Sequence, residues 1–189
     1  QSTKTKYFSL LTLLNNAFKP HGIYLSATIR LHQIKYAQKT GVPPVKRGVL
    51  MYYNMGEVQK ETTVNSILDN AIGAKYLNKL ADYPLPLDVA LPLFQWGVLF
   101  RKDKMIKLLN DHWEVIKSTY LNGVYLYKGD KIRLEKSERT DLKKAAELLQ
   151  KHLKIDSRSI IFYHLDSTVL HHFKVEDLAE IISQLKIEN

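Results

Sequence analysis

Residues 23–31 read Ile23-Tyr24-Leu25-Ser26-Ala27-Thr28-Ile29-Arg30-Leu31, a run rich in apolar and β-branched side chains. The run does not alternate cleanly between apolar and polar residues, which is typical of a strand covered on both faces. A second run of this kind, Gly48 to Asn54, follows a loop whose paired prolines, Pro43 and Pro44, can continue neither a helix nor a strand ladder. Two such strands favour a parallel sheet.

Helical and extended patterns alternate along the rest of the chain. Leucines at helical spacing stop at Pro20 and Gly22, and Pro92 within a later apolar run is expected at a bulge or at a strand's carboxyl end. This alternation implies right-handed β-α-β crossovers in an α/β fold. The expected helices cover about 5–19 and 32–38, a segment capped by Thr63 or Asn65 that ends near Leu80, a stretch over 105–110, and residues 141–153 and 175–185. The expected strands cover 88–94, 97–100 and, as a buried strand, 159–166. Residues 125–135 are expected to form a hairpin or an irregular strand about Gly129-Asp130.

The length of the chain limits the architecture. Its 189 residues contain neither repeats nor a linker that would divide them, so residues 1–189 are predicted to form a single α/β domain. A complete barrel of eight β/α units needs about 250 residues. We therefore expect a partial or divergent TIM-like barrel built from parallel β-α-β units, with a complete smaller open sheet as the alternative.

Composition excludes several kinds of chemistry. Without cysteine the chain has no disulfide, zinc-thiolate site, iron–sulfur cluster or cysteine nucleophile, and its redox compartment is undetermined. No apolar run approaches the ~18 residues that span a bilayer, so no transmembrane segment is expected. The sequence lacks the motifs of dinucleotide, phosphate-loop, α/β-hydrolase and HExxH zinc sites, and it implies no cofactor.

Positive charge is concentrated in the first third. The net charge is +9, and residues 1–56 hold eight Lys or Arg and no acid. One interpretation is a non-catalytic module that holds a polyanion on a basic face, with an affinity that falls steeply with salt. The other is that the chain begins partway through a larger protein whose acids lie upstream, which a start at Gln1 supports. Nucleic acid is not an expected partner, because no RNP motif or helix-turn-helix is found.

Polar side chains follow four of the predicted strands. In parallel α/β folds the carboxyl ends of the strands meet at one rim, where functional groups gather. Amides, carboxylates and an indole suit an oligosaccharide or another small polar ligand, because a sugar offers hydroxyls to bind and an apolar face to stack on. The expected substrate contacts are Arg30, His32, Gln33, Asn54, Gln95, Trp96 and His164, and the expected acid/base groups are Glu57 and Asp166.

Each of these residues also has a purely structural interpretation. Arg30 and His32 suit structural ion pairs or bonds to carbonyl groups equally well. Trp96 suits the core or a lid as well as a stacking platform. His164 and Asp166 share one strand face as an acid/base or metal pair, yet an Asp here is more often a cap for the next turn. The adjacent His171 and His172 point apart and make a weak metal site.

Glycoside hydrolysis sets a further requirement. It uses two carboxylates about 5–5.5 Å apart for retention or about 6.5–9.5 Å apart for inversion. Glu57 and Asp166 are the best placed, and Glu135 is a third candidate if residues 125–135 return to the same face. Asp88 lies at the start of its strand, at the end of the sheet associated with stability, and is discounted. A complete catalytic pair is not evident.

Several stretches together resemble an uncharacterised bacterial lipoprotein family. They are Leu25 to Gln33, Thr40 to Pro44 with Gly48 to Gly56, Tyr83 to Pro92 with Trp96 and Arg101, and Phe162 to Ser167. Members look like divergent TIM-barrel glycoside hydrolases, and the resemblance covers most of the chain. It implies that this chain is the later part of a barrel whose first strands, with an Asp-bearing strand end, lie upstream. It also implies a location in the cell envelope or outside the cell, and it carries no established activity. Neither the substrate nor the oligomeric state is predicted.

Overall fold

Four parallel strands form the main sheet of the computed structural model, which describes residues 3–110, 118–121, 123–153, 158–164 and 167–186. The strands are β1 (Ser26–Arg30), β2 (Arg47–Met51), β3 (Leu87–Pro92) and β9 (Ile160–Tyr163), in the order β1-β2-β3-β9. Each neighbouring pair is parallel. The predicted α/β fold of β-α-β units is therefore confirmed, as an open part of a barrel within the described residues. Pro92 ends β3, as predicted.

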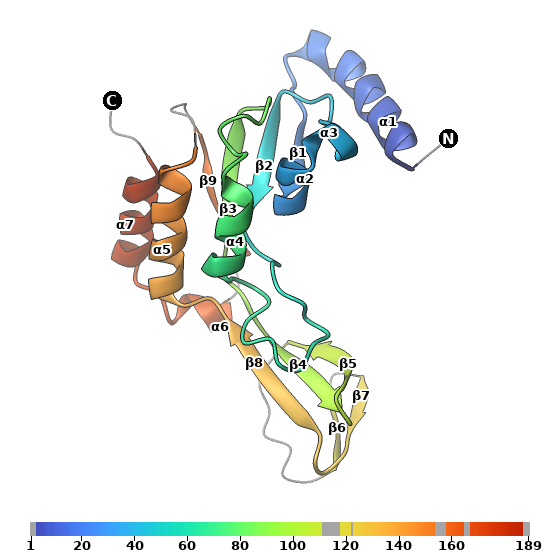
Figure 1. The fold of residues 1–189 in the computed structure, drawn as a ribbon, viewed down its shortest axis with the longest axis vertical. Helices are drawn as coiled ribbons and strands as arrows, with labels where there is room; N and C mark the ends of the chain where they lie inside the picture. The colour runs from blue at the N-terminus through green and yellow to red at the C-terminus, as the bar shows by residue number, and fades with distance from the viewer. Residues whose placement is uncertain (1–2, 111–117, 122, 154–157, 165–166, 187–189) are drawn as a thin grey trace.

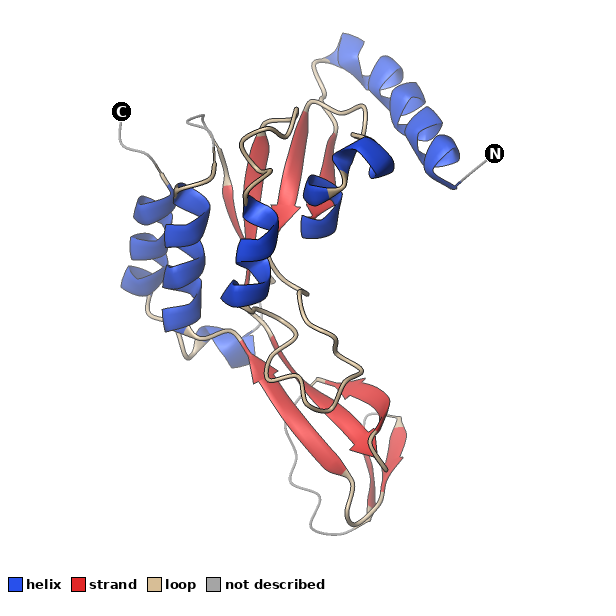
Figure 2. Ribbon diagram, in the orientation of Figure 1, coloured by secondary structure: helices blue, strands red, loops and turns tan. Residues whose placement is uncertain are grey.

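Helices connect the parallel strands and cover one face of their sheet (Figures 1 and 2). In Figure 1, α4 lies in front of β3, α5 and α7 lie beside β9, and α1 lies near the amino-terminal ends of the strands. The predictions for the first and last helices are confirmed. The helical elements are α1 (Thr3–Phe18), η1 (Lys19–His21), α2 (Leu31–Lys35), α3 (Ala37–Thr40), α4 (Asn70–Leu77), α5 (Arg139–Gln150), α6 (Ser167–Leu170) and α7 (Val175–Leu185). None of the helices in the described ranges combines the length and the apolar character needed to cross a bilayer.

The core lies between this sheet face and the helices. Ile29, Leu50 and Val89 occupy register positions beside one another and are fully buried. The opposite face of β1 is open, because exposed residues alternate with buried ones along the strand. The prediction that residues 23–31 are covered on both faces is therefore wrong. The apolar run misled because Ile23 and Tyr24, which precede the strand, are themselves exposed.

A second, antiparallel part projects beyond the carboxyl ends of the parallel strands (Figure 1). We call residues 95–136 the antiparallel extension. Its main sheet has the order β5-β4-β8, with a separate hairpin of β6 and β7. The chain enters the extension directly after β3 and leaves it into α5. Its strands are β4 (Gln95–Arg101), β5 (Lys104–Leu109), β6 (Thr119–Leu121), β7 (Val124–Leu126) and β8 (Lys131–Lys136).

One prediction within the extension is wrong. The helical stretch expected over 105–110 is strand β5, which pairs with β4. Lys102 and Asp103 both adopt positive φ, 48° and 62°, and so form the tight turn that returns the chain as an antiparallel strand. Of the two alternatives for 125–135, the irregular strand is observed, since β7 and β8 are separated by a turn, and the hairpin is not, because β7 pairs with β6 and β8 pairs with β4.

The helix expected from Thr63 or Asn65 begins later than predicted. Asp69 is the N-cap of α4, and its Oδ1 accepts hydrogen bonds from the backbone N–H groups of Ala71 and Ile72, both at 2.9 Å. Asn65 instead closes a local turn, because its Oδ1 accepts from the N–H of Ile67 at 2.9 Å. Residues 52–69 therefore form a long loop between β2 and α4.

Candidate ligand-binding site

A pocket of about 270 Å³ lies where β1 and β2 end. Three of the predicted ligand contacts, Arg30, His32 and Asn54, line it together. We call it the carboxyl-end pocket, and its lining comprises Arg30, Leu31, His32, Met51, Tyr53, Asn54, Met55 and Tyr76. A guanidinium, an imidazole and an amide thus meet two phenol rings and two thioethers, in the mixture of polar and apolar groups that small-molecule sites use.

The start of α2 holds the first side of this pocket. Arg30 ends β1 in extended conformation and is the N-cap residue of α2. Its N–H donates to Oε1 of Gln33 at 2.8 Å, so Gln33 anchors the first turn of the helix. Gln33 does not line the pocket, and its contact with a ligand stays a prediction. His32, which follows within the same turn, is exposed and lines the pocket.

The backbone after β2 presents Asn54. Asn54 has φ of 55°, a left-handed conformation that Asn tolerates better than most residues because its short amide bonds locally. Its N–H donates to the carbonyl of Ile67 at 2.7 Å, which ties this turn to the loop before α4. The Asn54 side chain is exposed at the pocket. Asn54 is therefore held by its backbone, while its exposed amide makes no hydrogen bond with any described group.

Tyr52 and Tyr53 are adjacent in sequence but have different surroundings, because Tyr52 lies in the core and Tyr53 lines the pocket. Tyr52 is fully buried towards α4, with its hydroxyl 3.5 Å from Oδ1 of Asn70, and burial together with the nearby charge of Asp69 raises its pKa to about 12. Tyr53 lines the pocket, and burial, with a smaller effect of Tyr163, raises its pKa above the ordinary value. Both phenols stay protonated at neutral pH, and Tyr53 offers its ring to the site.

Aromatic rings continue from Tyr53 across the ends of β3 and β9. The rings of Tyr53 and Tyr163 stack with centroids 5.4 Å apart and planes 2° apart. Phe94 packs edge-on against both rings, and its own ring lies 5.9 Å from His164 and 5.2 Å from Trp96. We call these five residues the aromatic cluster. The cluster brings the predicted contacts His164 and Trp96 into the same neighbourhood as the pocket.

Trp96 has a structural partner in Glu135, a residue on β8. The indole Nε1 donates to Oε2 of Glu135 at 2.8 Å, and Ser66 donates to the same oxygen through its N–H at 2.9 Å and through its hydroxyl. Arg133 donates to Oε1 through Nε at 2.7 Å. The Glu135 side chain is 0% exposed. Glu135 is thus a buried, fully bonded carboxylate, and its predicted place as a third acid at the rim is not supported.

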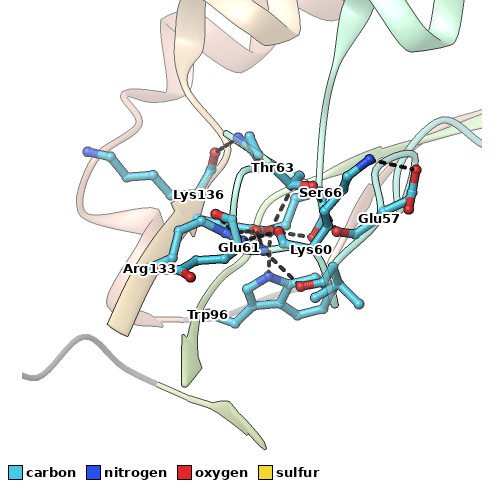
Figure 3. Close-up of polar contacts among 12 residues, drawn as sticks. Glu57, Lys60, Glu61, Thr63, Ser66, Trp96, Arg133 and Lys136 are labelled. Atoms are coloured by element: carbon cyan, nitrogen blue, oxygen red, sulfur yellow. Dashed lines mark hydrogen bonds and ion pairs between the residues drawn. The ribbon is translucent and has the colours of Figure 1, made fainter. Parts of the chain in front are cut away.

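Arg133 extends this network into the long loop (Figure 3). Its guanidinium donates to the carbonyl oxygens of Lys60 at 2.7 Å and of Val58 at 2.9 Å, and to that of Glu61 at 3.1 Å. Figure 3 shows Trp96, Arg133 and Ser66 converging from β4, β8 and the loop. Arg133 and Glu135, which form an ion pair on β8, therefore bond the antiparallel extension to residues 58–66. The same loop carries the pocket residue Asn54 near its start.

Of the two predicted acid/base groups, only Glu57 lies within the described residues. Glu57 is exposed on the loop, 3.8 Å from Nζ of Lys60, and does not line the pocket. Asp166 lies outside the described residues. Gln95 begins β4 and is half-buried, away from the pocket lining. Catalysis by Glu57 and Asp166 stays a prediction.

Asp88 acts at the amino-terminal end of the sheet, as expected. Both of its carboxylate oxygens accept from Arg47, at 3.0 and 3.2 Å, and Oδ1 also accepts from the N–H of Ser159 at 2.7 Å. These hydrogen bonds connect β2 and β3 to the start of β9.

No three His, Asp or Glu side chains in the described ranges gather as metal ligands would, and His171 and His172 are both exposed.

The basic residues of the first third are spread over several elements. Arg47 is engaged by Asp88, Arg30 lines the pocket, and Lys46 lies over the ring of Tyr24, 3.5 Å from its centroid. Lys4 lies at the start of α1. Lys4 also donates to the carbonyl of Lys39 at 3.3 Å. Binding of a polyanion to the basic first third stays a prediction.

Sequence reasoning missed Tyr53, Tyr76 and Tyr163. The alternation of a strand predicts that one of Tyr52 and Tyr53 faces the helices and the other faces the opposite side, so Tyr53 carried a usable signal. Tyr163 carried the same signal, because it is the last strand residue before the predicted contact His164. Tyr76 carried none, because it reaches the pocket from α4 across a packing contact.

No model of a protein family matches the chain, and no curated protein sequence matches it. Solved structures do resemble its fold. A chitinase from Chromobacterium violaceum ATCC 12472 has a TM-score of 0.58 at 12% identity, over 98% of this chain and 62% of that one. The Ostrinia furnacalis Group IV chitinase has a TM-score of 0.50 at 12% identity, over 96% of this chain and 62% of that one. Its complex with allosamidin has a TM-score of 0.50 at 10% identity, over 97% of this chain and 63% of that one.

These similarities are similarities of fold. They support the expectation of a partial or divergent barrel built from β-α-β units. The chain spans less than two thirds of the length of each chitinase.

Proposed function

We propose that this chain binds an oligosaccharide at the carboxyl-end pocket. The observation that carries the proposal is the joint lining of this pocket by Arg30, His32 and Asn54 beside the rings of Tyr53 and Tyr76. The polar groups supply donors and acceptors for sugar hydroxyls, and the rings supply flat apolar faces for the C–H side of a sugar. A site at the carboxyl ends of parallel strands is where α/β folds place their ligands.

The fold similarity to chitinases suggests which sugars to consider first. One of these structures is a complex with allosamidin. We therefore propose oligosaccharides of N-acetylglucosamine as the ligand class. The amide of Asn54 and the guanidinium of Arg30 suit the acetamido group, which offers one donor and one acceptor.

The size of the pocket limits how much of the ligand it holds. Its volume of about 270 Å³ is slightly below the ~300–1,000 Å³ of typical small-molecule sites. We propose that the pocket holds a single sugar unit and that further units extend along the aromatic cluster. Tyr163, which is 48% exposed and stacks on Tyr53, is the ring best placed to continue the binding surface.

Hydrolysis is a separate proposal from binding. It requires two suitably spaced carboxylates, and the predicted pair is Glu57 and Asp166. The lining described here supports binding through neutral and cationic groups and through rings. Processing of the bound sugar, membership of the bacterial lipoprotein family and a location in the cell envelope remain predictions from sequence.

The test is a titration of the isotope-labelled chain with N-acetylglucosamine oligosaccharides, followed by NMR. We expect saturable shifts at residues 30–32 and 53–55 that persist at high salt. His32→Ala and Asn54→Gly should each weaken binding, and Gly is chosen because it keeps the left-handed backbone at position 54. Glu147→Gln, on the exposed side of α5, is the matched control. Absence of shifts, or unchanged affinity in both pocket variants, would overturn the proposal.

A further inference from the structure

A second groove lies on the helix side of the molecule. It has a volume of about 730 Å³ and runs between α2, α3 and the segment that follows α4. It shares none of its lining residues with the carboxyl-end pocket. We call it the lysine groove, and its lining comprises Ile34, Lys35, Tyr36, Ala37, Gln38, Lys39, Val42, Lys79, Asp82, Tyr83 and Pro84.

Three ammonium groups surround this groove. Lys35, Lys39 and Lys79 contribute three positive charges against the single carboxylate of Asp82. Among the described residues, none of the three lysines lies within 4.0 Å of a carboxylate oxygen, the separation that defines an ion pair. The groove therefore has a net positive charge that no ion pair between described residues neutralises.

Tyr83 contributes a buried side chain to the wall of this groove. It lines the groove, its residue is only 3% exposed, and its hydroxyl makes no hydrogen bond with any described group. A buried hydroxyl without a partner is unfavourable, and most such groups in folded proteins are bonded. Burial also raises the pKa of Tyr83, so the hydroxyl stays protonated and can only be satisfied fully by an acceptor that receives its proton.

The rest of the lining is apolar. Ile34, Val42 and Pro84 lie among the charged groups, together with the ring of Tyr36. The volume falls within the ~300–1,000 Å³ of sites that enclose a small organic ligand. A bare inorganic ion would use the charges and leave this apolar surface unused.

We propose that the lysine groove binds a small molecule that carries a phosphate group on an aromatic or apolar body. Lys35, Lys39 and Lys79 neutralise the phosphate as point charges, and Tyr83, whose hydroxyl is enclosed by the protein, forms part of the groove wall. The apolar lining takes the body of the ligand. This site goes beyond the proposed oligosaccharide site, uses different residues and does not depend on it.

The experiment is an NMR titration of the labelled full chain with phenyl phosphate, which joins one phosphate to one ring. We expect saturable shifts at residues 34–39 and 79–84. Phenol, which has the ring without the charge, should bind far more weakly. Inorganic phosphate, which has the charge without the ring, should also bind more weakly than phenyl phosphate. Equal binding by phenol or by inorganic phosphate would overturn the proposal.

Variants separate the roles of charge and hydroxyl. The double variant Lys39→Gln/Lys79→Gln should weaken phenyl phosphate binding by about tenfold or more, since charged hydrogen bonds contribute well over a kilocalorie each. Tyr83→Phe keeps the ring that lines the groove and removes only an enclosed hydroxyl, so it should bind phenyl phosphate like wild type. Lys144→Gln, an exposed lysine on α5, is the matched control. Unchanged affinity in the double variant would overturn the proposal even if shifts were seen.

Two further arms distinguish this site from the others. An N-acetylglucosamine oligosaccharide added to the same sample reports on the carboxyl-end pocket alone, so either site can fail without the other. A short single-stranded oligonucleotide tests the polyanion alternative. Shifts of residues 34–39 with the oligonucleotide, but none with phenyl phosphate, would replace the small-molecule site by a polyanion surface.

Discussion

Trp96 and Glu135 lie directly opposite each other on β4 and β8, and the indole of the first donates a 2.8 Å hydrogen bond to the carboxylate of the second. Directly opposed residues have side chains on the same face of a sheet, so the register itself brings the two groups together. Trp96 was expected to stack on a sugar. This bond shows that its polar edge is committed to the protein, while its ring packs against Phe94 in the aromatic cluster.

Replacing Glu135 with Gln should destabilise the fold strongly. The substitution keeps the shape but places an amide N–H₂ either against the donors of Arg133 or against those of Ser66 and Trp96, and it leaves the largely enclosed Arg133 guanidinium without its countercharge. Breaking a buried pair in this way costs about 3–5 kcal/mol. The free energy of unfolding in urea measures the loss. Glu138→Gln is the control, because its pair with Lys136 is half exposed and should contribute less than about 1 kcal/mol. An equal effect of the two substitutions would contradict the assigned role of Glu135.

Removing the hydroxyl of Tyr83 should have the opposite effect. Tyr83→Phe deletes a buried donor that has no partner among the described groups, so the unfolding free energy should rise by about 1 kcal/mol. The comparison is Tyr120→Phe, where the ring is 69% exposed and little change is expected. Thermal and urea unfolding of both variants provide the measurement. A loss of stability in Tyr83→Phe would show that the hydroxyl already has a bonding partner.

The stability of the extension should depend on pH through Asp130. The hydrogen bond from Arg101 to Asp130, with a further backbone N–H bond and the charge of Arg101, holds the pKa of Asp130 below its ordinary value of 3.8. A carboxyl whose native pKa is depressed adds stability above its unfolded pKa and loses that contribution as the pH falls through the native pKa. We therefore expect the unfolding free energy to fall below about pH 3.8.

The Asp130 prediction has a direct control. Asp130→Asn should flatten this acid dependence and lower stability at neutral pH. Asp103→Asn, at an 80% exposed side chain in the adjacent turn, should leave the profile unchanged. The measurement is a set of unfolding curves at several pH values from neutral down to about 2, which is roughly the lowest pKa of a carboxyl group stabilised in its charged form. Parallel profiles for wild type and Asp130→Asn would refute the assignment.

Gly73 in α4 should not tolerate alanine. Ala is favoured over Gly in helices by about 1 kcal/mol, so this substitution usually stabilises. Here a Cβ would clash with the Tyr52 hydroxyl and lie 2.8 Å from its Cζ, with Met55 Sδ at 3.2 Å. Overpacking of this kind costs about 1–3 kcal/mol and should prevail. Urea unfolding of Gly73→Ala beside Asn78→Ala, just after the same helix, tests this. A stabilised Gly73→Ala would mean that Tyr52 can move freely.

Tyr163 should matter for oligosaccharide binding through its ring. Tyr163→Ala removes the exposed partner of the stack on Tyr53, so affinity for longer oligosaccharides should fall by about threefold to tenfold, as for other aromatic contacts. Tyr163→Phe keeps the ring and should bind like wild type. Calorimetry with short and long oligosaccharides separates the two. Equal loss in both variants would shift the argument from the ring to the hydroxyl.

The parallel sheet could be predicted because its evidence is local. Val49, Leu50 and Met51 form part of an apolar run, and Pro92 has no N–H to donate to a neighbouring strand. A few consecutive residues are therefore enough to predict each strand. Residues 105–109 could not be assigned in this way. Met105-Ile106-Lys107-Leu108-Leu109 fits a helix and a strand equally well, and the choice is made by the turn at Lys102 and Asp103, where two non-glycine residues adopt positive φ.

The residues of the candidate site also fall into those that local sequence predicts and those that it does not. Arg30, His32 and Asn54 follow strand ends, so the rule for parallel sheets was sufficient to group them. Glu135 meets Ser66 across 69 residues of sequence, and its carboxylate is enclosed by groups from three separate segments. No spacing in the sequence distinguishes such a carboxylate from a catalytic one. Its role follows only from counting the donors that surround it.

The antiparallel extension begins and ends at neighbouring points. Gln95 and Lys136 are paired across β4 and β8, and the Ser137 hydroxyl lies 3.5 Å from the carbonyl of Phe94. The whole extension is therefore a closed excursion, and the route from β3 to α5 is the same whether the excursion is long or short. Changes in its length can be absorbed at its far end without altering the register of the parallel strands. The chain thus separates a constant framework from a segment that is free to vary in size.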